Sequence, residues 1–163
     1  MAIEIIEHAS GCIHRGCTFE ITGVATISAS STLKLLGVID GRDVALHNYV
    51  IRGDRGPFTV ELLEAPTVTA VGTPLQQQNR NRNVANNTST VSVYSGPTTS
   101  GGTVIYTARV PDVGAGSHVQ GGEDAMPYEW VLKRNESYVF QITNNDASND
   151  LNISFEMLWC EGL

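Results

Sequence analysis

The chain has 163 residues, of which 41% are hydrophobic, and it carries a formal net charge of −7 at pH 7. This length is typical of one domain with one core, and the net charge disfavours direct binding to nucleic acid or to an anionic membrane surface, because both would repel an acidic protein. No stretch approaches the ~20 apolar residues of a membrane-spanning helix and no secretory signal opens the chain, so we expect a protein made in the cytoplasm, with no membrane and no direct nucleic-acid partner.

Four side chains that can bind metals lie close together near the N-terminus: His8, Cys12, His14 and Cys17. A zinc clip is one interpretation, but structural zinc sites usually combine a Cys-x2–4-Cys pair with a second, separated ligand pair, and this spacing does not match that pattern. The chain has 3 cysteines, an odd number, which argues against a closed set of disulfides in a reducing compartment. The simpler interpretation is a polar N-terminal loop with two small buried or half-buried thiols and no bound metal or cofactor.

Alternation of apolar and polar residues, typical of a β-strand with one wet face, recurs along the chain. The predicted strands with this pattern lie around residues 19–27, 58–62, 91–93, 104–108, 138–142 and 151–159, and 130–133 is a further short strand. The runs 33–39 and 44–51 are more continuously apolar, as expected of strands covered on both faces. In the last strand the odd-numbered residues from Leu151 to Trp159 are apolar and face one way, so Cys160 is expected on the opposite, partly exposed face.

Turn residues separate these runs. Gly, Pro, Asn, Asp and Ser gather at 40–41, 53–57, 95–97, 100–102 and 144–146, where tight connections need pre-bent or positive-φ backbone. About nine strands without a predicted helix favour an all-β fold, a two-sheet antiparallel β-sandwich of jelly-roll type, over a small closed barrel. We predict one domain over 1–163, with 1–31 as an N-terminal strand or arm region and 32–163 as the sandwich body.

Two long polar stretches interrupt the strand pattern, at 72–88 and 111–127. Irregular loops longer than about 12–15 residues are usually functional or mobile. The candidate interaction residues are Asn79, Arg80, Asn81, Arg82 and Asn83. Guanidinium groups bind carboxylates in pairs, and asparagine amides can hydrogen-bond exposed strand edges. The alternative is that both arginines pin their own loop to an acidic strand of the same subunit.

The sequence contains no recognisable catalytic motif. Gly-x-Ser-x-Gly, His-Glu-x-x-His and the glycine-rich phosphate and dinucleotide loops do not occur, and no His-x-His of a cupin-like metal site is present. The acid pairs Glu61 with Glu64 and Glu123 with Asp124 are interpreted as solvated edges, and His47 as a sheet-face or core histidine. We therefore expect that the protein is not an enzyme and has no catalytic residues.

Several short motifs follow one another between Leu33 and Glu161. They are Leu35-Leu-Gly, the strand with His47, Val60-Glu-Leu-Leu-Glu-Ala-Pro-Thr-Val-Thr, Gly72-Thr-Pro, Asn79-Arg-Asn-Arg-Asn, Val91-Ser-Val-Tyr, Gly121-Gly-Glu, Glu129-Trp-Val-Leu-Lys, Ile142-Thr-Asn-Asn and Leu158-Trp-Cys-Glu. This series resembles a family of small virion structural proteins encoded by tailed bacteriophages. Those of the family that have been placed tend to sit on the head as decoration or cement subunits.

The resemblance implies a structural protein of the virion that binds the outer surface of the capsid and stabilises the head. It implies the major capsid protein and further copies of the same chain, as a homotrimer or homodimer, as partners, and a location on the capsid surface after synthesis in the host bacterial cytoplasm. The alternative is a carbohydrate-binding β-sandwich module associated with a tail fibre or baseplate. Sugar sites generally need exposed aromatic side chains, whereas Trp130 and Trp159 fall in apolar strand phases and are expected mainly in the core.

Overall fold

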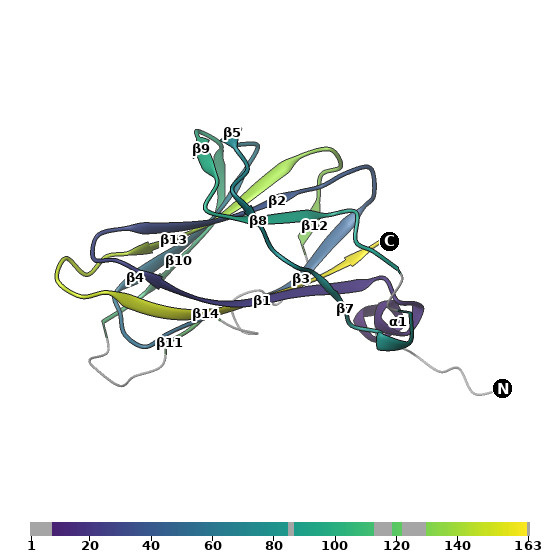
Figure 1. Ribbon diagram of the computed structural model, residues 1–163, viewed down its shortest axis with the longest axis horizontal. Coiled ribbons are helices and arrows are strands. Elements are labelled where there is room, and N and C mark those ends of the chain that lie inside the picture. The colour runs from purple at the N-terminus through teal and green to yellow at the C-terminus, as the bar shows by residue number, and fades with distance from the viewer. Residues whose placement is uncertain (1–7, 85–86, 113–118, 122–129, 163) are drawn as a thin grey trace.

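The alternating residues form a sandwich of two antiparallel sheets in the computed structural model, which describes residues 8–84, 87–112, 119–121 and 130–162 (Figure 1). The single helix in these ranges is α1 (His8–Arg15), and a 3-10 turn, η1, covers Arg82–Val84. The strands are β1 (Thr18–Ile27), β2 (Thr32–Val38), β3 (Val44–Gly53), β4 (Phe58–Glu64), β5 (Thr67–Ala70), β6 (Thr73–Pro74), β7 (Gln78–Asn79), β8 (Ser92–Ser95), β9 (Thr98–Ser100), β10 (Thr103–Val110), β11 (Val119–Gly121), β12 (Trp130–Leu132), β13 (Ser137–Asn144) and β14 (Leu151–Glu161).

The order of the strands is that of a jelly roll. The first sheet runs β11-β3-β14-β1-β7, with β12 also paired to β3, and the second runs β10-β4-β13-β2-β8-β6. Strands β1 to β4 alternate between the two sheets, β10 stays beside β4, and β11, β13 and β14 alternate again, so that β1, β14 and β3 face β2, β13 and β4. This crossing pattern is the double Greek key of jelly-roll sandwiches. The predicted β-sandwich is therefore confirmed.

The core lies between the two sheets and consists of the apolar phase of each strand. In β14 the side chains from Leu151 to Trp159 that were predicted to face one way are all buried. They meet Leu35, Leu62 and Phe140 of the facing sheet within one apolar cluster. The packing leaves an apolar cavity of about 50 Å³ between the sheets. Trp159 is a core residue, as predicted, and Trp130 is half-buried against the cluster.

A bent ribbon connects β4 to β10 and leaves the sandwich. Strands β4 and β10 pair as neighbours. Beyond them, the same two segments of the chain continue outward as the paired strands β5 and β9. The bend occurs where Ala65 and Gly102 both adopt positive φ, of 54° and 94°. The β5–β9 ribbon therefore rises out of the body, as Figure 1 shows at the top of the view.

The chain between β5 and β9 returns to the body and covers two sheet edges. Strand β6 pairs with β8, which pairs with β2 at the edge of one sheet, while β7 pairs with β1 at the edge of the other. Strands β6 and β7 have only two residues each, and β6 contains Pro74. Very short edge strands and proline are devices that stop further pairing at an edge.

Two predictions need correction. The described residues form fourteen strands rather than about nine, because the polar stretches contain short strands that show no apolar alternation in the sequence. The N-terminal region also contains α1, where no helix was predicted; this helix has only 8 residues, and Gly11 and Ser10 weaken its helical pattern. The following strand β1 is an interior strand of its sheet, between β14 and β7. The stretch 111–127 lies outside the described residues except for 111–112 and β11.

Within the described residues, no helix is long and apolar enough to cross a membrane.

Gly37 offers a position at which one methyl group should stabilise the core. It lines the apolar cavity, and a Cβ built there meets no atom closer than 4.0 Å. We expect Gly37→Ala to raise the free energy of unfolding by about 0.5–1 kcal/mol, because alanine restricts the unfolded chain and adds buried apolar surface. Chemical denaturation of both proteins measures the difference.

Gly23→Ala is the matched control. Gly23 lies opposite Phe155 in the β1–β14 ladder, and a Cβ there would stand 2.4 Å from the Phe155 ring. The same substitution should therefore destabilise the protein by about 1–3 kcal/mol through overpacking. Equal effects of the two alanines would contradict the proposed placement of Gly37 at an open space.

Candidate functional site

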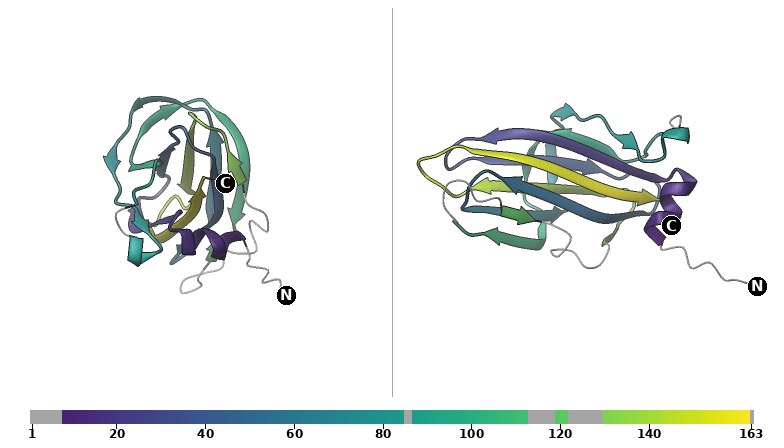
Figure 2. Two further views of the ribbon diagram at one scale, coloured as in Figure 1. Left: turned by 90° about the vertical axis from the view of Figure 1, so that its right-hand side faces the viewer. Right: turned by 90° about the horizontal axis from the view of Figure 1, so that it is seen from below.

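The cysteines and the Asn/Arg segment, which the sequence analysis treated separately, lie together at one end of the sandwich. The helix α1, the segment around β7 and η1, and the C-terminal end of β14 meet there, as the end-on view of Figure 2 shows. The cysteines belong to the helix and the last strand, and the Asn/Arg residues belong to the segment beside them. We call this region the helix corner; it comprises residues 12–20, 79–84, 87–91 and 159–161.

Gly16 ends α1 and turns the chain back. Its φ is 72°, its N–H donates to the Ile13 carbonyl at 2.9 Å, and the next N–H, of Cys17, donates to the Cys12 carbonyl at 3.1 Å. This pair of bonds is the Schellman motif that closes helices with a left-handed glycine. A Cβ on Gly16 would lie 2.1 Å from the Val84 side chain. The motif therefore places Cys17 close to Cys12, and a side chain at position 16 would need both a strained backbone and a displaced Val84.

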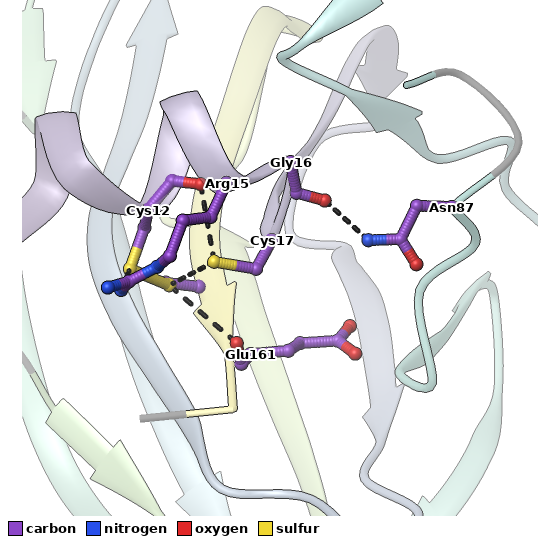
Figure 3. Close-up of a disulfide and its surroundings, with 7 residues drawn as sticks. Cys12, Arg15, Gly16, Cys17, Asn87 and Glu161 are labelled. Atoms are coloured by element: carbon purple, nitrogen blue, oxygen red, sulfur yellow. Dashed lines mark hydrogen bonds between the residues drawn. A yellow bond between two sulfur atoms is a disulfide. The ribbon is translucent and has the colours of Figure 1, made fainter.

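The three cysteines form one sulfur cluster (Figure 3). Cys12 and Cys160 form a disulfide with Cα atoms 6.3 Å apart, across 148 residues of sequence. The Cys17 Sγ lies 3.6 Å from the Cys160 Sγ, and its thiol donates to the Cys12 carbonyl at 3.2 Å. All three sulfur atoms lie within 4.8 Å of one another.

These positions correct the sequence interpretation of the cysteines. The odd number of thiols argued against a disulfide, but Cys12 is bonded to Cys160 and Cys17 is the one left over. Cys160 was expected to be partly exposed and is fully buried. The cause is α1, which packs at this end of the strand and covers the face that alternation alone assigned to solvent. The expected buried or half-buried state of Cys12 and Cys17 is confirmed.

Of the three residues of the suspected zinc clip whose side chains are described, only the two cysteines come together. His14 is exposed, and its backbone carbonyl accepts a bond from the Asn81 amide at 3.0 Å. The side chain of His8 lies outside the described part of the molecule. The cationic side chain of Arg15 lies beside the cysteines, where its Nη2 donates to the Cys12 Sγ at 3.3 Å.

Asn79 and Asn81 build the helix corner rather than facing outward. The buried Asn79 amide donates to the Gly16 carbonyl at 2.7 Å, and its Oδ1 accepts the Asn81 N–H at 2.8 Å. Asn87 donates to the same Gly16 carbonyl at 2.6 Å. The end of the helix is therefore held by amide groups of the Asn-rich segment, a role that no local sequence signal indicates.

The two arginines of the segment differ. Arg80 Nη1 contacts Glu20 Oε2 of β1 at 2.5 Å, so it pins its own loop to an acidic strand, which is one of the two roles considered for it. Arg82 and Asn83 have exposed side chains. Arg82 borders an open polar hollow of about 510 Å³, whose floor includes Phe19. Of the five candidate interaction residues, Arg80, Arg82 and Asn83 are exposed, and of these Arg80 is engaged by Glu20.

Glu161 is the important residue of the helix corner that sequence analysis missed. It is buried, and its carboxylate accepts bonds from the Thr90 N–H at 2.9 Å, the Thr90 hydroxyl at 2.8 Å and the Trp159 indole N–H at 3.1 Å, as well as from the Ser89 hydroxyl. These bonds tie the segment before β8 to the last strand. A Glu at the end of an alternating strand is expected to be exposed to solvent. The burial of Glu161 depends on the position of residues 89–91, which the sequence does not reveal.

The other ionisable candidates have structural partners. Glu64 contacts Lys133 at 2.6 Å and accepts the Tyr138 hydroxyl at 3.0 Å, and the bond from Lys133 holds the pKa of Glu64 below its usual range. Glu61 accepts a bond from Gln141. His47 is half-buried in β3, at the register shift opposite β14. Glu123 and Asp124 lie outside the described residues.

Exposed aromatic side chains are missing from the described residues. The large hydrophobic side chains with high exposure there are all valines, at positions 24, 71, 84, 104 and 131. A flat aromatic platform of the kind that binds sugar rings is therefore not formed by this part of the chain.

We expect Glu161→Ala to lower the free energy of unfolding by about 3 kcal/mol, because it removes a buried charged acceptor and leaves the Thr90 and Trp159 N–H groups without it. The control is Glu156→Ala on the same strand, where the carboxylate is half-buried; a change within about 0.5 kcal/mol is expected there. Urea denaturation monitored by Trp fluorescence measures both. Similar losses in the two variants would refute the clamping role of Glu161.

Comparison with known proteins gives no family. No protein-family model matches the chain, and no curated protein matches it. Among solved structures, a mitogen derived from Yersinia pseudotuberculosis (YPM) aligns over 85% of this chain and 83% of its own, with 13% sequence identity and a TM-score of 0.34. A similarity of this size carries no inference about fold or function.

Proposed function

We propose that the protein is a structural protein of a bacteriophage virion, a decoration or cement subunit that binds the outer surface of the capsid and stabilises the head without catalysing a reaction. The observation that carries this proposal is the β5–β9 ribbon, which projects from a rigid jelly roll and has little core of its own. The series of motifs that resembles phage structural proteins is the second support.

The ribbon has the properties of a docking element. Thr67, Thr69, Ala70, Thr98 and Ser100 are exposed on it. An isolated two-stranded ribbon is marginally stable in water, and its outer edges carry unpaired N–H and C=O groups that can pair with another chain. On the body side it is held by Lys34, whose ammonium group donates to the Thr99 carbonyl at 3.2 Å and hydroxyl at 3.0 Å. These two bonds tie the ribbon to β2 of the body.

Arg82 and Asn83 form the second part of the proposed contact. They are exposed at the helix corner, where a guanidinium group can bind a carboxylate of the capsid protein. The remaining surface is polar with few charges, since Asp, Glu, Lys and Arg make up 17% of the chain. A stable interface of ordinary size buries about 1,200–2,000 Å², and a homotrimer or homodimer would gain further affinity because each contact makes the next one intramolecular.

The test is binding to capsids of the parent phage that lack the protein. After mixing, the particles are sedimented, bound copies are counted per particle, and the thermal stability of the heads is followed. We expect saturable binding at a stoichiometry set by icosahedral positions, together with heads that open at a higher temperature. Absence of binding would refute the cement role and would direct the search to tail fibres and glycan arrays.

Two exposed valines give a matched pair of variants for the contact surface. Val71 follows β5 on the ribbon and is 45% exposed, whereas Val24 is 83% exposed on β1. We expect Val71→Glu to weaken capsid binding at least about tenfold, since a charge would have to be desolvated in the interface, and Val24→Glu to leave it unchanged. Equal loss in both variants would show that the ribbon is not the contact.

A further inference from the structure

We infer that Cys12, Cys17 and Cys160 form a thiolate site for one thiophilic divalent cation, such as Zn²⁺, in the reduced protein, and that the Cys12–Cys160 disulfide is the oxidised, metal-free form of the same site. This inference does not depend on the proposed capsid role. It rests on the geometry, burial and charge of the helix corner.

The geometry suits a tetrahedral ion. With metal–sulfur bonds of about 2.3 Å, two thiolates on one zinc ion lie roughly 3.8 Å apart. The Cys17 and Cys160 sulfur atoms are already 3.6 Å apart, and all three lie within 4.8 Å of one another. Once the disulfide is reduced, Cys12 needs only a small side-chain adjustment to complete the triangle.

The backbone prepares this arrangement. The Cys-x4-Cys pair of Cys12 and Cys17 lacked a second, separated ligand pair in the sequence pattern, and the fold supplies one member of it, Cys160. The Schellman motif at Gly16 turns Cys17 toward Cys12. Cys160 lies opposite Thr18 in the β1–β14 ladder, which places it beside the other two cysteines. The neighbouring Glu161 N–H donates to the Cys17 carbonyl at 2.9 Å. Three cysteines from two distant segments are therefore placed by main-chain structure.

Burial and charge support binding. Cys12 and Cys160 are fully buried while Cys17 is half-buried, which leaves an open side where water can supply a fourth ligand. Three thiolates and one divalent cation have a net charge of −1. The Arg15 guanidinium, 3.3 Å from the Cys12 sulfur, offsets that charge. A soft sulfur site of this kind favours Zn²⁺ or Cd²⁺ over Mg²⁺ or Ca²⁺.

The two forms interconvert by a balanced redox step. A thiol reductant supplies two electrons and two protons to the disulfide, which gives three thiols. Binding of the cation then releases their three protons. In the other direction hydrogen peroxide takes two electrons from the Cys12 and Cys160 thiolates; the S–S bond forms, the O–O bond breaks, and with two protons the peroxide leaves as two molecules of water. The cation then leaves as the Cys17 thiolate takes up a proton.

The test is an anaerobic titration of the reduced protein with Co²⁺ alone, followed by competition with Zn²⁺. We expect one equivalent of Co²⁺ to produce sulfur-to-metal charge-transfer absorption that Zn²⁺ abolishes. Zn²⁺ should also protect all three cysteines from alkylation, counted by mass spectrometry. Cys17→Ser keeps the Cys12–Cys160 bond and hence the oxidised fold. After reduction it should bind Co²⁺ at least ~10-fold more weakly, because replacing even a residue that only contacts a metal ligand typically weakens binding by that much.

Each outcome is decisive. Absence of charge-transfer absorption in the reduced protein refutes the site, whether the protein is folded or not by circular dichroism. Reduced protein that is unfolded and refolds with one equivalent of metal supports it, because structural metal sites couple binding to folding. If Cys17→Ser binds as tightly as the unaltered protein, Cys17 is not a ligand and the three-cysteine site is wrong.

Discussion

The first sheet depends on the insertion of β14 between β1 and β3. Ten consecutive pairs join β14 to β1, from Thr18 opposite Cys160 to Ile27 opposite Leu151, and Figure 2 shows the last strand lying between two of the earliest ones. Because these partners are more than 100 residues apart, the chain must close long loops before the sheet can gain its hydrogen bonds and apolar contacts. The helix corner lies at one end of this ladder. The pairing of β14 with β1 therefore brings together the residues that form the disulfide, the Glu161 bonds and the Asn79 bonds.

The two-residue periodicity was sufficient to predict the strands that build the sandwich. In β1, β4 and β14 the apolar phase of the sequence is largely the buried phase of the structure, because one face of each strand lies toward the core. In β13 Val139 on the other face is buried as well, and in β10 Val104 of the expected inner phase is 48% exposed, because the register shifts between Val104 and Tyr106. The more continuous apolar run of β3 was also interpreted correctly, since most of its residues are buried. The strands that were missed, such as β6 and β7, are too short to carry a period and exist only because an edge strand pairs with them.

The candidate site could be predicted only in part, since its key contacts join segments that periodicity treats separately. Cys160 alternates with core residues and so was assigned to the wet face, yet α1 covers that face. Asn79 lies in a polar stretch that resembles a solvated loop, yet its amide is buried against Gly16. A glycine after a short helical segment, with two cysteines around it, was the available signal. It indicates a helix end, but it does not say what packs there.

The two sides of the sandwich differ in whether short strands cover the sheet edges, and an uncovered edge is where a strand of another chain can pair. On the β1 and β2 side the chain covers both edges with the short strands β7, β8 and β6. On the other side β10, with 8 residues, pairs within the described residues only with β4. Long edge strands invite pairing with another chain unless something blunts them. The β5–β9 ribbon continues from this same β4–β10 pair, so among the described residues the β10 edge and the ribbon form one continuous feature. Under the proposed capsid role, a partner strand that pairs with the ribbon would also lie beside the β10 edge.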